Sequence, residues 1–142
     1  MKNYHTHTTR CMHAIGSEEE YILAAISAGY TELGFSDHTP WHYESGYHAT
    51  MRMDESQLED YVHTLSALRD KYKDKISIKI GLECEYFEDK MEWLKVQLEK
   101  YKLDYIILGN HFDGSDETGI YYGYPVSLEE LKRYVSQVIK AM

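Results

Sequence analysis

The stretch from Ile76 to Tyr86, ISIKIGLECEY, decides the fold of this chain. Its apolar side chains come at every second position, which predicts a β-strand with one buried face. The opposite face would carry Glu83 and Glu85. Segments with helical spacing of apolar residues precede and follow the stretch. A buried strand between two helices is typical of a βα fold with a parallel sheet.

The rest of the chain repeats this alternation of strand and helix. Strands are predicted at residues 2–6, 32–36, 76–86 and 104–109, and helices at 17–29, 54–72, 88–101 and 127–142. The first and last helices begin with capping boxes, Ser17 with Glu20 and Ser127 with Glu130. Four such units predict an α/β fold built on a parallel sheet.

Composition restricts the function. The 142 residues include 24 acidic and 15 basic side chains, and the resulting net charge of −9 argues against a broad nucleic-acid-binding surface. A small anionic substrate remains compatible, because bound metal ions reverse the local field. Two cysteines, Cys11 and Cys84, do not make a disulfide framework. No signal peptide or bilayer-length apolar run is evident, so a cytoplasmic protein is expected.

Residues that bind metals stand where each predicted strand ends. In chain order they are His5 and His7, then Asp37 and His38, then Glu83, and finally His111. The carboxyl ends of parallel strands meet at one edge of the sheet, so these side chains should gather there. Imidazole and carboxylate groups together suit zinc, manganese and iron. The pattern therefore predicts a metal site, in which His5 and His7 would face the same way from one strand.

Two residues near this edge have further predicted roles. Asp37, beside His38, is interpreted as an orienting group or a proton shuttle, with a structural role in the following loop as the alternative. Arg52 is interpreted as a bidentate phosphate clamp, and the alternative is a solvated residue before a helix. His42 and His48, from the same loop, are weaker candidates for substrate contact. Glu85 shares a face with Glu83 and could support the site.

The ordered motifs also resemble a known family. HTHT with His13 shortly after it, SDH, GLECEY and GNHF together resemble the polymerase-and-histidinol-phosphatase (PHP) superfamily. The segments GFSDHTP, MRM and YIILGNHF resemble its histidinol-phosphatase branch. The resemblance implies a distorted (β/α)7 TIM-like barrel with up to three divalent metals (zinc, manganese or iron) at the carboxyl ends of its strands.

The resemblance also implies a distribution of ligands. His5, His7 and Glu83 would bind one metal, and Glu83 would bridge to a second metal held by His111. The third metal would be held by His13 and His38. The implied reaction is hydrolysis of a phosphomonoester, L-histidinol phosphate in histidine biosynthesis, by a hydroxide that bridges two metals. Two alternatives are a PHP-type nuclease and a non-catalytic metal-binding fragment.

The length departs from the family pattern. A closed barrel takes ~200 residues or more, whereas this sequence contains four βα units in 142 residues. Residues 1–142 are therefore expected to form a single PHP domain that lacks the C-terminal strands and helices. Self-association, or a partner that supplies those segments, is expected through the first and fourth strands and the last helix. The apolar face of that helix carries Leu131, Tyr134, Val135, Val138 and Ile139.

Overall fold

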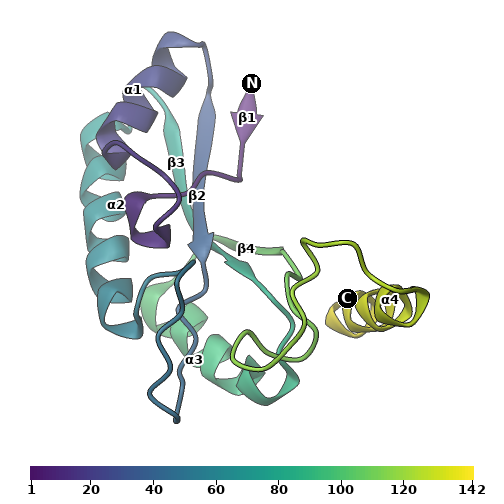
Figure 1. Ribbon diagram of the computed structural model, residues 1–142. Coiled ribbons are helices and arrows are strands. Elements are labelled where there is room, and N and C mark those ends of the chain that lie inside the picture. The colour runs from purple at the N-terminus through teal and green to yellow at the C-terminus, as the bar shows by residue number, and fades with distance from the viewer.

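The computed structural model describes all residues from Met1 to Met142. Its four strands form one parallel sheet in the order β1-β2-β3-β4 (Figure 1). The strands are β1 (Lys2–Asn3), β2 (Glu32–His38), β3 (Ser77–Cys84) and β4 (Tyr105–Leu108). The predicted parallel α/β sheet is confirmed.

Four α-helices alternate with the strands. They are α1 (Glu18–Ser27), α2 (Leu58–Tyr72), α3 (Met91–Tyr101) and α4 (Leu128–Ala141), and 3-10 turns lie at Thr9–Cys11, Glu55–Gln57 and Glu88–Lys90. Both predicted capping boxes are present, at Ser17 with Glu20 and at Ser127 with Glu130. None of the helices combines the length and the apolar character that a bilayer crossing requires.

The alternation in β3 divides its side chains between two faces. Ile78, Ile80 and Leu82 are buried in the core. There they join apolar side chains of β2 and of the three helices α1, α2 and α3, which lie along one side of the sheet in Figure 1. The helix-facing side of β3 is thus filled by core packing. Glu83 lies on the opposite face, near the carboxyl end of the strand, and takes no part in this core packing.

The first strand is shorter than predicted. It ends at Asn3, so His5 and His7 lie in an irregular segment instead of a strand. The Asn3 side chain explains the early end, because it accepts a hydrogen bond from the His5 backbone N–H and donates one to Thr6 Oγ1. The segment still returns to the sheet, where the Ser36 backbone N–H donates to the Thr6 carbonyl oxygen.

One aromatic ring crosses the inner face of the sheet. Tyr105, from β4, lies over Gly81 of β3 and Gly34 of β2. A Cβ atom at Gly81 would stand only 2.7 Å from carbons of that ring, so the crossing requires glycine there. The Tyr105 hydroxyl lies 2.7 Å from the carbonyl oxygen of Tyr4 and 3.0 Å from that of Phe35. The ring therefore fills the space beneath the carboxyl end of the sheet.

The last helix is set apart from the other three. Figure 1 shows α4 beyond β4, at the end of a long loop. Its residues Leu131, Val135 and Ile139 are exposed, and so are Ile106 and Leu108 of β4. Strand β4 pairs with β3 alone. The structure therefore has an open sheet edge next to an apolar helix face that nothing covers.

Candidate metal centre

Glu83 lies at the centre of a group of imidazole side chains at the carboxyl end of β3. Its Oε2 atom is 3.0 Å from Nε2 of His5 and 3.2 Å from Nε2 of His7. The same oxygen is 3.3 Å from Nδ1 of His38. Its Oε1 atom is 3.6 Å from Nε2 of His111. Residues from all four βα units therefore converge on one buried carboxylate.

His13 completes the group. Its ring centroid lies 4.8 Å from that of His7 and 5.2 Å from that of His38. Its Nδ1 atom is 2.7 Å from the Cys11 carbonyl oxygen, which can only accept, so Nδ1 carries the hydrogen and Nε2 is the available ligand atom. We call these six residues the Glu83 cluster: His5, His7, His13, His38, Glu83 and His111.

Three sets of potential ligand atoms lie within 4.8 Å of one another in the cluster. They are His5, His7 and Glu83; His38, Glu83 and His111; and His7, His13 and His38. The first set equals the implied ligands of one metal. The other two sets place His38 beside Glu83 and His111 as well as beside His13. His38 is thus nearer to Glu83 than the implied distribution suggests.

The chemistry of these donors fits divalent cations. His38 Nδ1 is buried and has no hydrogen-bond partner, and burial lowers the pKa of this imidazole to about 3. A neutral ring with an unshared electron pair is what a metal requires. Burial opposes ionisation of Glu83, but hydrogen bonding from His7 and the neighbouring imidazoles lower its pKa to about 2. The site therefore offers an anionic oxygen at Glu83 and a neutral nitrogen at His38.

The balance of buried charge also favours bound cations. Arg52 is the only lysine or arginine among the buried residues, whereas four carboxyl groups are buried: Asp37, Glu83, Glu85 and Asp116. Buried carboxylates are costly unless cations compensate them. Bound metal ions would supply the missing positive charge.

Asp37 lies behind the cluster. It belongs to β2 and not to the following loop, and its side chain is fully buried. It accepts hydrogen bonds from the backbone N–H and the hydroxyl of Thr8, and its Oδ1 atom is 4.0 Å from His7 Nδ1. Asp37 therefore lies in a strand and not in the loop that the alternative assumed. The position suits an orienting group, whereas a proton shuttle would need access to the substrate.

Arg52 is placed differently from both expectations. It is 1% exposed, which contradicts the alternative of a solvated residue. Its two Nη atoms donate to both Glu85 oxygens, at 2.8 and 3.0 Å, and Nη1 also donates to the Thr39 carbonyl oxygen. Its Nε atom lies 3.0 Å from Asp116 Oδ2. A phosphate clamp would need free guanidinium N–H groups, but those of Arg52 already contact Glu85, Thr39 and Asp116. The predicted phosphate clamp is therefore wrong, and Arg52 makes a structural contact.

Glu85 supports the cluster, as the shared face with Glu83 suggested. Besides Arg52, its oxygens accept a hydrogen bond from Trp41 Nε1 at 3.0 Å and lie 3.3 Å from His111 Nδ1. Burial opposes ionisation of Glu85, but the His111 contact and the charge of Arg52 lower its pKa to about 2. The carboxylate is thus fully occupied and does not itself face a metal.

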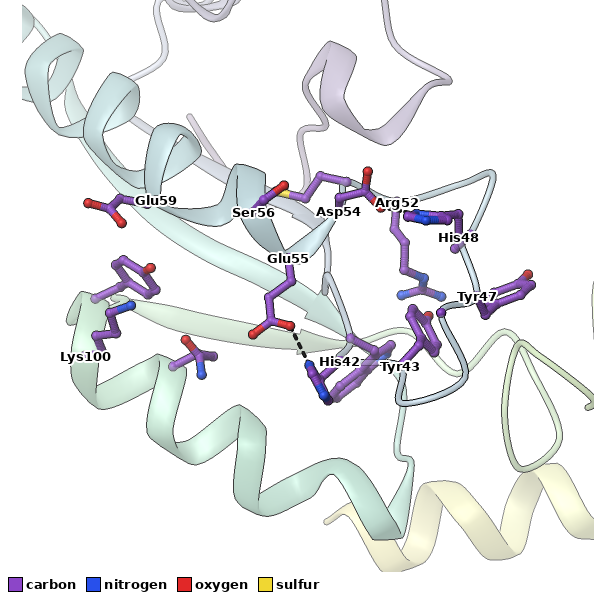
Figure 2. A pocket seen from close by; sticks show the side chains of 16 residues that line it. His42, Tyr43, Tyr47, His48, Arg52, Asp54, Glu55, Ser56, Glu59 and Lys100 are labelled. Carbon is purple, nitrogen blue, oxygen red and sulfur yellow. Dashed lines mark hydrogen bonds and ion pairs between the residues drawn. The ribbon is translucent and has the colours of Figure 1, made fainter.

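One cavity lies away from the cluster. It has a volume of about 610 Å³, and none of the six cluster residues lines it. His42 and His48 lie here, paired with Glu55 at 2.6 Å and Asp54 at 2.9 Å (Figure 2). The predicted loop histidines are therefore not brought to the metal-binding residues.

A second cavity opens at the cluster itself. It has a volume of about 400 Å³ and is lined by His13, His38 and His111 of the cluster and by Met51, Phe112 and Tyr121. We call it the mouth. Its walls combine imidazole nitrogens with a thioether and two aromatic rings. A small molecule with a charged end and a planar or apolar end would fit such walls.

Gly109 was not predicted as a functional position. A Cβ atom there would collide with the Glu83 carboxylate, so only glycine lets the chain pass so near the cluster directly after β4. Its place two residues before His111 was the available signal. Thr8 and Asp116 were also missed, because their partners are distant in sequence.

Comparison with known proteins gives a consistent result. The family described as PHP domain matches residues 3–142. A probable histidinol-phosphatase of Deinococcus radiodurans is 32% identical over 111 residues, which is 78% of this chain and 42% of the relative. The histidinol-phosphatase of Bacillus subtilis is 29% identical over 128 residues, with 84% and 47% covered. The chain thus spans less than half the length of these relatives.

Two solved structures share the fold. A Listeria monocytogenes structure assigned to the histidinol phosphatases has a TM-score of 0.72 at 25% identity, covering 99% of this chain and 59% of that one. Histidinol phosphate phosphatase of Lactococcus lactis, solved with zinc, L-histidinol and phosphate, has a TM-score of 0.73 at 22% identity. It covers 98% of this chain and 52% of the other, and this likeness concerns the fold.

Proposed function

This chain belongs to the PHP domain family, and from that premise we propose that it provides the metal-binding part of a phosphomonoesterase. The substrate that we propose is L-histidinol phosphate. The observation that carries the proposal is the convergence of four imidazoles on the buried Glu83 carboxylate, with a fifth, that of His13, beside two of them. No other part of the chain gathers several imidazole nitrogens around one carboxylate in this way.

The proposed ligands are the six residues of the Glu83 cluster, and zinc, manganese and iron are the metals that suit them. When bound, such ions lower the pKa of a water molecule and compensate charge on the phosphoryl oxygens. The chain's own contribution is to hold the donors in place. Asp37 fixes the segment before His13 through Thr8, and Glu85 accepts from His111. We therefore assign Asp37 an orienting role.

The mouth would receive the organic part of the substrate. Phe112 and Tyr121 have ring centroids 5.2 Å apart and line the mouth beside His111. An imidazole ring such as that of histidinol would stack on these aromatic side chains. The Lactococcus lactis relative was solved with L-histidinol and phosphate, which supports this choice of substrate. A role in histidine biosynthesis in the cytoplasm belongs to the same proposal, in keeping with two free thiols.

Hydrolysis assays test the proposal. The chain, joined to the remaining strands and helices of a PHP barrel, is incubated with L-histidinol phosphate, p-nitrophenyl phosphate and single-stranded DNA, before and after removal of metal by a chelator. We expect release of phosphate from histidinol phosphate, loss of that activity with chelator and recovery with manganese or zinc. Preferred cleavage of DNA would instead support the nuclease alternative.

A second candidate function is a metal-binding fragment that assembles with a copy of itself. The observation that favours it is the uncovered apolar surface of β4 and α4, which includes Ile106, Leu131 and Ile139. Full burial of one such side chain is worth roughly 1.5–3 kcal/mol, so pairing of these surfaces would be favourable. Bound metal without turnover of any of the three substrates would support this candidate.

A further inference from the structure

Two loops meet beside the Glu83 cluster at three side chains. Residues 39–54 follow β2, and residues 109–127 follow β4. Asp116, from the second loop, lies 3.0 Å from Arg52 Nε and accepts a hydrogen bond from the Tyr43 hydroxyl at 2.5 Å. The side chains of Asp116 and Arg52 are each only 1% exposed. The contact is therefore a buried ion pair between two loops that are distant in sequence.

Arg52 carries this contact inward. Figure 2 shows its side chain running from the loop with the guanidinium beside Tyr43. Nη1 and Nη2 of the guanidinium donate hydrogen bonds to the two carboxylate oxygens of Glu85. This bidentate geometry holds the guanidinium and the carboxylate in one plane. Asp116 contacts the remaining nitrogen, Nε. The guanidinium is thus held between two carboxylates, by hydrogen bonds to Glu85 and by an ion pair with Asp116.

Glu85 then contacts a residue of the cluster. Its Oε1 atom, which accepts from Arg52, also lies 3.3 Å from His111 Nδ1. A carboxylate only accepts hydrogen bonds, so Nδ1 of His111 carries a hydrogen, and in the neutral ring Nε2 carries none. The unshared pair on Nε2 is left facing Glu83 Oε1, at 3.6 Å. This is the tautomer that a metal ligand needs.

We propose that Asp116 is a positioning residue for the metal centre, acting through Arg52 and Glu85 to hold the imidazole of His111 toward Glu83. The inference rests on the proposed function, because it assumes that His111 binds metal. The proposal adds that metal binding depends on the Arg52–Asp116 contact between the two loops. Without Asp116, the guanidinium loses one of its two carboxylate partners, and the position of Glu85 beneath His111 becomes less defined.

Cobalt(II) titration of the full chain tests the proposal, because the visible absorption of bound cobalt reports ligand number and geometry. The variants are Glu85→Gln, Asp116→Asn and the double variant. Asp113→Asn is the matched control, since Asp113 lies in the same loop and pairs with the exposed Arg133 away from the cluster. Loss of a residue that orients a metal ligand costs about 10- to 100-fold in affinity. We expect that loss for Glu85→Gln and about tenfold for Asp116→Asn, with an altered spectrum in both and no change in the control.

The double variant separates positioning from a merely structural role. If Asp116 acts through Glu85, the double variant should bind cobalt no more weakly than Glu85→Gln alone. Wild-type affinity and spectrum in Asp116→Asn, or fully additive losses in the double variant, would overturn the proposal. Should circular dichroism show that Asp116→Asn does not fold, Tyr43→Phe replaces it, with the same spectral change expected and an unchanged spectrum as the contrary result. A wild-type chain that takes up no cobalt would refute the metal centre itself.

Discussion

The Nε2 atoms of His5 and His7 lie 3.0 Å apart, and Glu83 Oε2 lies 3.0 and 3.2 Å from them. An imidazole nitrogen carries at most one hydrogen, so if both rings donate from Nε2 to Glu83 Oε2, the short contact between the two Nε2 atoms is one between two donors. One cation in contact with all three would satisfy them together. The two histidines that open the chain are therefore arranged as a pair for a metal, even though they do not lie in a strand.

We predict that Glu83→Gln removes more bound metal than His63→Gln. Glu83 is the only carboxylate in contact with four of the five cluster imidazoles, and the amide has no negative charge to replace it. His63 is an exposed residue of α2 and serves as the matched control. Metal content is measured by atomic emission after dialysis. Equal content in the two variants would refute the assignment of Glu83.

Gly109→Ala should weaken metal binding by displacing Glu83. The added Cβ atom would collide with the carboxylate, which can escape only by turning away from the imidazoles. We expect at least a tenfold lower affinity for zinc, as for loss of a group that orients a ligand. Gly114→Ala is not a suitable control, because Gly114 has φ of 86°, a backbone conformation that would strain any residue other than glycine. Ala28→Gly, far from the site, shows instead whether small backbone changes alone affect binding.

Thr8→Val should destabilise the fold by about 1–3 kcal/mol, because it leaves a buried Asp37 oxygen without its hydroxyl donor. Valine keeps the shape of threonine, so packing is largely conserved. Thr9→Val, at an exposed neighbouring position, is the control. The free energy of unfolding is obtained from urea denaturation of metal-free protein. A loss no larger than that of the control would show that the Thr8 hydroxyl contributes nothing to holding Asp37.

Light scattering after size exclusion should give a mass above that of one chain at micromolar concentration. The reason is the apolar surface on β4 and α4, which includes Leu108, Leu131 and Val135. Val135→Lys should shift the mass toward the monomer, because the charge would have to be buried in any pairing. Ser136→Lys, exposed on the same helix, should leave it unchanged. A compact wild-type monomer that melts cooperatively would contradict the proposed self-association.

The sequence predicted what depends on local patterns. Alternation placed Glu83 on the inner face of β3, and the carboxyl-end rule gathered His38 and His111 beside it. The capping boxes gave the starts of α1 and α4. The length of β1 was overestimated, because a side-chain hydrogen bond from Asn3 outweighs strand propensity there.

Contacts between loops that are distant in sequence could not be predicted from the sequence. The position of Arg52 depends on Asp116, which lies 64 positions further along the chain (116 − 52), in a loop with no periodic pattern. A solvated arginine, a phosphate clamp and a buried ion pair look the same in one sequence. Burial decides among them, and burial here follows from how two loops close on each other.

Tyr105 connects strands that are not neighbours in the sheet. Its hydroxyl reaches the carbonyl oxygen of Tyr4, the residue just before His5, while its own strand leads on to His111. The two sides of the Glu83 cluster are therefore joined from below by one phenol ring. The width of the metal-binding site is set by the length of that side chain, so the spacing of ligands from opposite ends of the sheet is fixed before any ion arrives.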